Sequence, residues 1–161
     1  MARPSPARSL GSGLAERARV RTLVAIIAAV TVILGACDDA QSRKTEEARQ
    51  KLVGTWLREF DAEGVHGRRL LVLGEDGKFS EVLVAQFGDG HIGRSERSGE
   101  WFFDGTNLKR RYTHEDGRQL TNNFAFVTFE ITVLTPRDFE GKNHVQGEQI
   151  SYRRVAPGTT P

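Results

Sequence analysis

The sequence predicts an all-β protein, a small antiparallel up-and-down barrel of six to eight strands with a short N-terminal helix. Asp-Gly pairs occur at 76–77, 89–90, 104–105 and 116–117, between segments rich in β-branched and aromatic residues. Such a pair between apolar runs indicates a hairpin turn, because glycine takes the positive φ that tight turns require. All 13 aromatic residues also lie after Gly54. Both patterns favour an antiparallel meander.

We expect strands near 53–60, 68–74, 78–87, 95–103, 107–114, 122–134, 138–145 and 148–155. Apolar residues alternate with polar ones in several of them, as on a half-buried strand. One face of the third expected strand carries Phe79, Glu81, Leu83, Ala85 and Phe87. A meander with one apolar face closes on itself or packs as two sheets, because open edges invite aggregation. We favour closure into a single-domain barrel.

Residues 1–36 are predicted to be a signal peptide. A flank with five arginines precedes a purely apolar run from Leu23 to Leu34, and small residues follow that run. This order is typical of secretory signal peptides. The run is about a dozen residues long, whereas a helix that spans a bilayer needs roughly 20. A permanent membrane span is therefore the weaker interpretation.

The segment Leu34-Gly35-Ala36-Cys37 resembles the lipobox of bacterial lipoproteins. In that family a diacylglyceryl thioether forms on the cysteine and a peptidase cuts before it, which here implies cleavage between Ala36 and Cys37. Two or three acyl chains, such as palmitate, would hold Cys37 on a membrane, because each buried CH₂ contributes about 0.8 kcal/mol. Cys37 is the only cysteine, so no internal disulfide is possible. The alternative is an inert cysteine in a signal-anchor helix.

Asp38 and Asp39 directly follow the expected lipidated cysteine. In enterobacterial lipoproteins an aspartate in the first of these places, helped by a second acidic residue, resembles the signal that retains a lipoprotein in the inner membrane. The resemblance implies a lipid-anchored protein on the periplasmic face of that membrane. The alternative is that both aspartates only begin a soluble linker.

Residues 37–44 contain no large apolar side chain and are expected to form a flexible tether. Residues 45–52 are expected to form a brief helix. Thr45 suits the N-cap, acidic residues follow it, and basic residues lie near the other end. The helix and the strands together make one expected domain, residues 45–161.

The segment Lys51–Trp56 resembles the start of the lipocalin-like domains found in small bacterial lipoproteins, through its Gly-x-Trp motif. Further similarity lies, in the same order, at 74–79, 99–101, 107–108, 131–135 and 152–155. The resemblance implies that Trp56 closes the base of the barrel and that Arg153 or Arg154 lies across its indole. It implies no particular ligand, because the domain is short for a lipocalin and lacks their disulfide cysteines.

Charge and motif spacing argue against several functions. Removal of residues 1–36 takes five arginines and one glutamate from 23 basic and 21 acidic residues, which leaves 18 against 20. No net basic field then remains to favour nucleic acid. The four histidines lack metal-ligand spacing, no second cysteine could complete a zinc site, and no nucleophile motif occurs. We therefore expect no metal, no cofactor and no catalytic residue.

The segment Lys109–Arg111 is the most basic stretch of the expected domain. We interpret it as a solvated strand face, since alternation sends only half of its side chains each way. The alternative is a face that meets anionic lipid headgroups or an acidic partner.

Three classes of function remain. The first is a lipid-anchored lipocalin-like module that binds a small apolar molecule in the barrel or at its mouth. The second is an envelope protein whose barrel surface contacts a protein partner, with no small ligand. The third is an enzyme, which is the least favoured class because no catalytic group of side chains converges in the sequence. The protein is therefore not predicted to be an enzyme.

Overall fold

The structure, a computed structural model, describes residues 40–121, 126–143 and 147–161. In these residues nine strands form one antiparallel sheet. They are β1 (Gly54–Ala62), β2 (Val65–Leu73), β3 (Lys78–Gln86), β4 (Ile92–Phe103), β5 (Asn107–Glu115), β6 (Arg118–Gln119), β7 (Phe126–Leu134), β8 (Asp138–Asn143) and β9 (Glu148–Val155). The described part of a helix covers residues 40–52. The predicted fold class, an all-β barrel with a short N-terminal helix, is confirmed.

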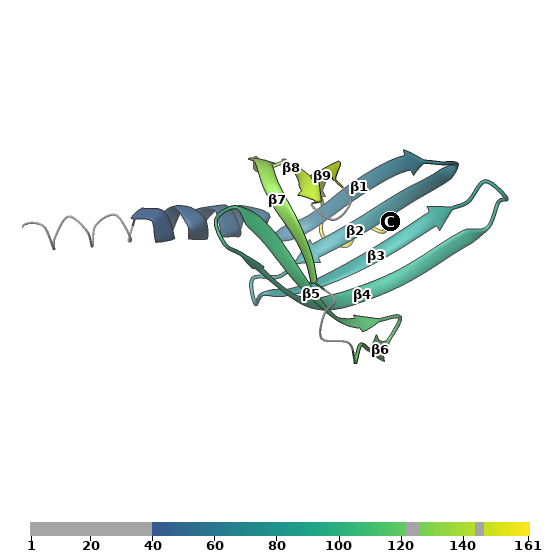
Figure 1. The fold of residues 1–161 in the computed structure, drawn as a ribbon, viewed down its shortest axis with the longest axis horizontal. Helices are drawn as coiled ribbons and strands as arrows, with labels where there is room; N and C mark the ends of the chain where they lie inside the picture. The colour runs from purple at the N-terminus through teal and green to yellow at the C-terminus, as the bar shows by residue number, and fades with distance from the viewer. Residues whose placement is uncertain (1–39, 122–125, 144–146) are drawn as a thin grey trace, which may run out of the picture. The chain divides into compact units, whose positions relative to one another are not determined.

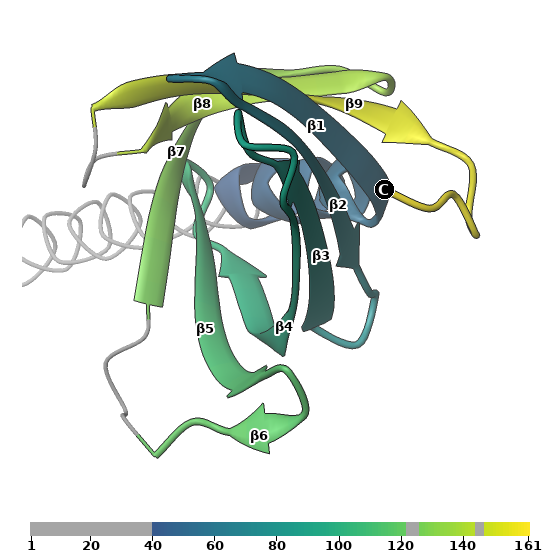
Figure 2. The same ribbon diagram turned by 90° about the vertical axis from the view of Figure 1, so that its right-hand side faces the viewer.

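Eight of these strands close into a barrel. The sheet order is β4-β3-β2-β1-β9-β8-β7-β5-β6, and β4 also pairs with β5, so β6 is an appendage on β5. Figure 1 shows β1 to β4 as one continuous wall, and Figure 2 looks along the ring that the strands make. The four Asp-Gly pairs lie in the turns where they were expected, and their glycines have φ between 76° and 100°.

Two strands begin earlier than expected, β2 at Val65 and β4 at Ile92. The β1–β2 turn consists of Glu63 and Gly64 alone, which have φ of 52° and 78°. Two consecutive positive φ angles are typical of a tight hairpin turn, but glutamate is an uncommon first residue there. The turn therefore carried a weak sequence signal. Residues 122–125 and 144–145, which were expected to be strand, lie outside the described residues.

Residues 40–44 are helical and do not form the flexible tether that was expected at 37–44. Side chains one turn apart support the helix after this segment, because Arg49 and Gln50 both donate to the Glu46 carboxylate, at 3.3 and 2.7 Å. Thr45 consequently lies inside the helix and is not its cap. No described helix has the length and apolar character needed to cross a membrane.

The last turns of the helix cover one end of the barrel, which we call the base. Leu52 is fully buried, and the Trp56 indole Nε1 donates to its carbonyl at 2.7 Å. Arg49 lies over the Trp101 ring, 5.1 Å from its centroid, and donates to the carbonyl of Glu75 at 2.7 Å. In Figure 2, which views the barrel from the opposite end, the helix lies behind the ring of strands.

Arg154 joins the helix, β1 and the turn between β7 and β8 at this base. It lies directly opposite Trp56 in the β1–β9 pairing, with its guanidinium carbon 4.1 Å from the indole centroid. It also donates to the carbonyls of Lys51, Val53 and Pro136, at 2.5, 2.8 and 2.7 Å. The carbonyls at a helix C-terminus lack intrahelical partners, and a cation there also complements the helix dipole.

The glycine of the Gly-x-Trp motif makes this contact possible. Gly54 has φ 138°, and a Cβ added to it would lie 2.2 Å from Nη1 of Arg154. Arg153 points the other way, as alternation along a strand requires, and pairs with Glu59 at 3.1 Å on the surface. Of the two arginines named from the sequence, Arg154 is the one that lies across Trp56.

The two arginines form a matched pair for testing the base. We expect Arg154→Lys to lower the free energy of unfolding by about 1–3 kcal/mol, because one ammonium cannot serve three carbonyls while it covers the indole. Arg153→Lys should change it by less than about 0.5 kcal/mol. Urea unfolding followed by tryptophan fluorescence measures both. Equal losses in the two variants would contradict the role assigned to Arg154.

Candidate functional site

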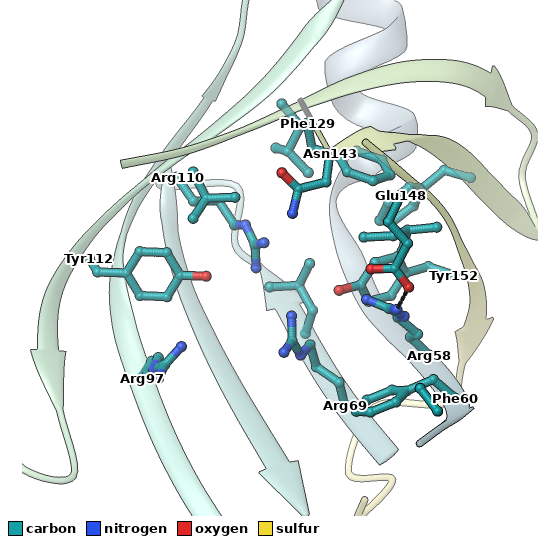
Figure 3. A pocket seen from close by; sticks show the side chains of 16 residues that line it. Arg58, Phe60, Arg69, Arg97, Arg110, Tyr112, Phe129, Asn143, Glu148 and Tyr152 are labelled. Carbon is teal, nitrogen blue, oxygen red and sulfur yellow. Dashed lines mark hydrogen bonds and ion pairs between the residues drawn. The ribbon is translucent and has the colours of Figure 1, made fainter. Parts of the chain in front are cut away.

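A cavity of about 360 Å³ lies inside the barrel between the base and the open end. Seven of the eight barrel strands contribute to its lining, and only β3 does not. The lining residues are Arg58, Phe60, Ala62, Arg69, Leu71, Arg97, Leu108, Arg110, Tyr112, Val127, Phe129, Phe139, Asn143, Glu148, Ile150 and Tyr152. Figure 3 shows these side chains around the central space. Four of them are arginines and one is acidic, so the lining is cationic.

Alternation along the strands places these charges inside. On β5 the inward-facing residues are Leu108, Arg110 and Tyr112, all of them buried. Leu108 belongs to the apolar core near the base, and Arg110 follows it one step toward the open end. Leu71 and Arg69 stand in the same relation on β2, which runs in the opposite direction. The interior is thus apolar at the base and charged at mid-height.

A buried glutamate on β3 pairs with the arginines at mid-height in the barrel. Glu81 is 3% exposed and Arg110 is 5% exposed. Nη1 of Arg110 donates to Oε2 of Glu81 at 2.5 Å, and Nε of Arg69 lies 3.9 Å from Oε1. The Tyr112 hydroxyl donates a longer hydrogen bond to Oε2, at 3.5 Å. Two guanidinium groups therefore share one carboxylate.

The surroundings set the charge states of this cluster. Burial raises the pKa of Glu81, but the charges of Arg110 and Arg69 outweigh burial and hold that pKa below its usual value. Burial raises the pKa of Tyr112 to about 12. At neutral pH Glu81 is therefore a carboxylate and Tyr112 keeps the phenolic proton that it can donate.

The cluster leaves donors without partners. Nε of Arg69 and Nε of Arg110 have no hydrogen-bond partner among the described residues. An unsatisfied buried donor costs about 1–3 kcal/mol, and more when it is charged. Buried ion pairs also contribute little stability compared with apolar packing. Charged groups kept in a cavity despite these costs indicate a functional site.

Side chains bridge the barrel wall beside the cavity. The β1–β9 backbone pairing covers only residues 55–57, so the rest of β1 has no backbone partner on β9. There Arg58 donates to Glu148 at 2.6 Å, the pair drawn with a dashed line in Figure 3. Elsewhere in the lining Arg97 pairs with Glu115 at 2.7 Å. Each of these two arginines thus has a carboxylate of its own.

The residues expected to be functional lie elsewhere. Trp56 and Arg154 meet at the base, and neither lines the cavity. The expected cleavage and lipidation site, Ala36 and Cys37, and the expected sorting residues, Asp38 and Asp39, lie outside the described residues.

The interpretation of Lys109–Arg111 as a solvated face needs correction at its middle residue. Arg111 is exposed and pairs with Glu100, whereas Arg110 points inward and is buried. The signal was available in the sequence, because Leu108 and Tyr112 flank Arg110 at two-residue spacing. Glu81 likewise stands on the face that was expected to be apolar.

The described residues contain no group of three or more histidine, cysteine, aspartate or glutamate side chains placed to hold a metal ion. The chain matches no protein-family model and no curated protein. The cavity is therefore characterised by its own chemistry, which is a closed apolar base and a cationic middle.

Replacing Glu81 tests whether its carboxylate stabilises the buried arginines. We expect Glu81→Gln to lower the free energy of unfolding by about 3–5 kcal/mol, because it leaves buried guanidinium groups without a counter-charge. Glu100→Gln is the matched control, since it breaks an Arg–Glu pair of equal length whose side chains are about half exposed. It should cost at most about 1 kcal/mol. Chemical denaturation measures both variants.

The difference in stability between the parent and Glu81→Gln should also depend on pH. The folded pKa of Glu81 lies below its usual value of 4.5, so its stabilisation is complete above that pH and is lost as the pH falls through the folded pKa. The advantage of the parent over Glu81→Gln should therefore shrink in acid. An advantage that stays constant from neutral pH into acid would contradict a charged Glu81.

Proposed function

We propose that this protein is a lipid-anchored cell-envelope lipoprotein whose lipocalin-like barrel binds a small molecule in the arginine-lined cavity. The observation that carries the proposal is a cavity of about 360 Å³ in a barrel whose other end is closed by the helix, Trp56 and Arg154. Small-molecule sites commonly span about 300–1,000 Å³ and combine apolar walls with a few convergent polar groups. Both properties are present here.

Apolar side chains supply a large part of the cavity wall. Phe60, Val127, Phe129 and Ile150 line it from three strands, and the last two are buried. Burial of a ligand against such surface contributes about 25 cal/mol per Å². This wall supports a ligand with an apolar part.

The anchoring part of the proposal rests on the sequence. Cleavage after Ala36 would leave Cys37 as the first residue, with its acyl chains in a membrane. Asp38 and Asp39 then favour retention at the periplasmic face of the inner membrane. A small molecule that reaches the periplasm would be the natural ligand of a barrel held there.

A second candidate function is supported by exposed aromatic residues. Phe102 and Phe126 are about half exposed, on the two strands that flank β5, and Lys109 lies 5.2 Å from the Phe102 ring centroid. Exposed aromatic and basic side chains suit contact with a protein partner. In this alternative the barrel surface is the binding element and no small ligand is needed.

Native mass spectrometry of the protein purified from membranes tests the binding function. We expect the parent to carry a co-purifying small molecule and Ala62→Trp to lose it, because Ala62 is an exposed lining residue at the end of β1, where an indole would obstruct the cavity from its rim. Ala156→Trp places the same ring at an exposed position outside the cavity and should retain the ligand. A bound protein in place of a small molecule would favour the second candidate.

Cys37→Ser tests the anchor. Serine cannot form the thioether, so we expect an uncut precursor without acyl label, measured by radioactive palmitate incorporation. The parent should be labelled and should sediment with the inner membrane. The double variant Asp38→Ser, Asp39→Ser should sediment with the outer membrane. Equal labelling of Cys37→Ser and the parent would refute the lipobox assignment.

A further inference from the structure

Three hydrogen-bond donors of the cavity converge on one space. Figure 3 shows the guanidinium groups of Arg69 and Arg110 and the hydroxyl of Tyr112 directed toward the centre of the cavity. All three line it, from β2 and β5. Arg110 is 5% exposed, and its Nε has no partner among the described residues. A ligand in the cavity could therefore accept a hydrogen bond from this buried cationic group.

The charges of the lining do not balance. Arg58 has Glu148 as its partner, and Arg97 has Glu115. Arg69 and Arg110, in contrast, share the single carboxylate of Glu81. Among the residues that the structure describes, four arginines therefore face three glutamates, which leaves an excess of one positive charge at mid-height. A buried charge without a counter-charge is strongly unfavourable, so one negative charge from a ligand would be stabilised here.

We propose that Arg69, Arg110 and Tyr112 bind the carboxylate of a compact amphipathic monoanion, an inference that rests on the proposed binding function. A planar carboxylate matches the fork of a guanidinium group, which can donate two parallel hydrogen bonds to it. The phenol of Tyr112 adds a further donor when its one proton turns from the long hydrogen bond to Glu81 toward the ligand, and burial keeps that phenol protonated.

Charge and size narrow the ligand class. A phosphate dianion would bring two negative charges toward Glu81 and Glu148, although the excess positive charge is only one. The apolar part of the ligand would lie against Phe60, Phe129 and Ile150. The cavity volume of about 360 Å³ is near the lower limit for small-molecule sites, so this part is a short acyl chain or a single aromatic ring.

Calorimetric titration with octanoate and 1-octanol tests the proposal, because the two probes differ in the carboxylate and share the apolar chain. The processed protein is held in lipid nanodiscs, and empty nanodiscs provide the blank. We expect octanoate to bind more tightly than 1-octanol. Arg69→Met should weaken octanoate binding at least about tenfold and leave 1-octanol unaffected, because charged hydrogen bonds contribute about 1.5–3 kcal/mol each. Arg111→Met, which removes an exposed arginine outside the cavity that pairs with Glu100, should change octanoate binding less than about twofold.

Tyr112→Phe provides a second variant that removes only one hydroxyl. It should weaken octanoate binding by roughly three- to tenfold, as expected for one hydrogen bond. Thermal melts establish whether each variant is folded. If Arg69→Met does not fold, Tyr112→Phe still tests the site.

The outcomes separate this proposal from the proposed function. Equal binding of both probes, unchanged in Arg69→Met, would overturn the carboxylate site and leave cavity binding intact. Displacement of octanoate by inorganic phosphate would also overturn it, in favour of a phosphate site. If neither probe binds while the parent still carries a ligand that Ala62→Trp removes, the ligand class is wrong. If the parent also carries no ligand, the proposed function fails.

Discussion

The contact between Arg154 and Trp56 is the interaction on which the barrel depends. β1 and β9 share only three cross-strand pairs, and Trp56 opposite Arg154 is the middle one. The guanidinium covers the indole and donates to carbonyls at the end of the helix, so the same side chain holds the barrel closed and the helix docked. Phe139 completes the base, with its ring 4.8 Å from the ring of Trp56.

A closed apolar base makes a charged interior tolerable. Arg110 and Glu81 stand one step above the core, where each has a partner at hydrogen-bond distance. Apolar residues in their places would stabilise the fold at least as well, because desolvation offsets much of the attraction within a buried ion pair. The short β1–β9 pairing has a second consequence, since it leaves the wall next to Arg58 to be bridged by side chains. The seam that needs Arg154 for closure is also the seam beside the cavity.

Much of the fold follows from local sequence signals. Glycine at the four Asp-Gly turns and two-residue alternation between them are properties of short segments, and they predict the strands to within a few residues. The signals failed where the local chemistry was ambiguous. Glu63-Gly64 turns the chain without the usual Asn or Asp, and residues 40–44 continue the helix although their composition also suits a linker.

By itself the sequence determined the β class, the turns and the inward direction of Glu81, because side-chain direction along a strand is a local property. Only the tertiary structure decided which residues meet. Arg110 and Glu81 are 29 residues apart and come together only when the barrel closes. Arg154 faces Trp56, and Arg153 does not, because the β1–β9 register directs every second residue of β9 to the interior and Arg154 is one of them. Register and closure arise from long-range pairing, which no short segment of the sequence encodes.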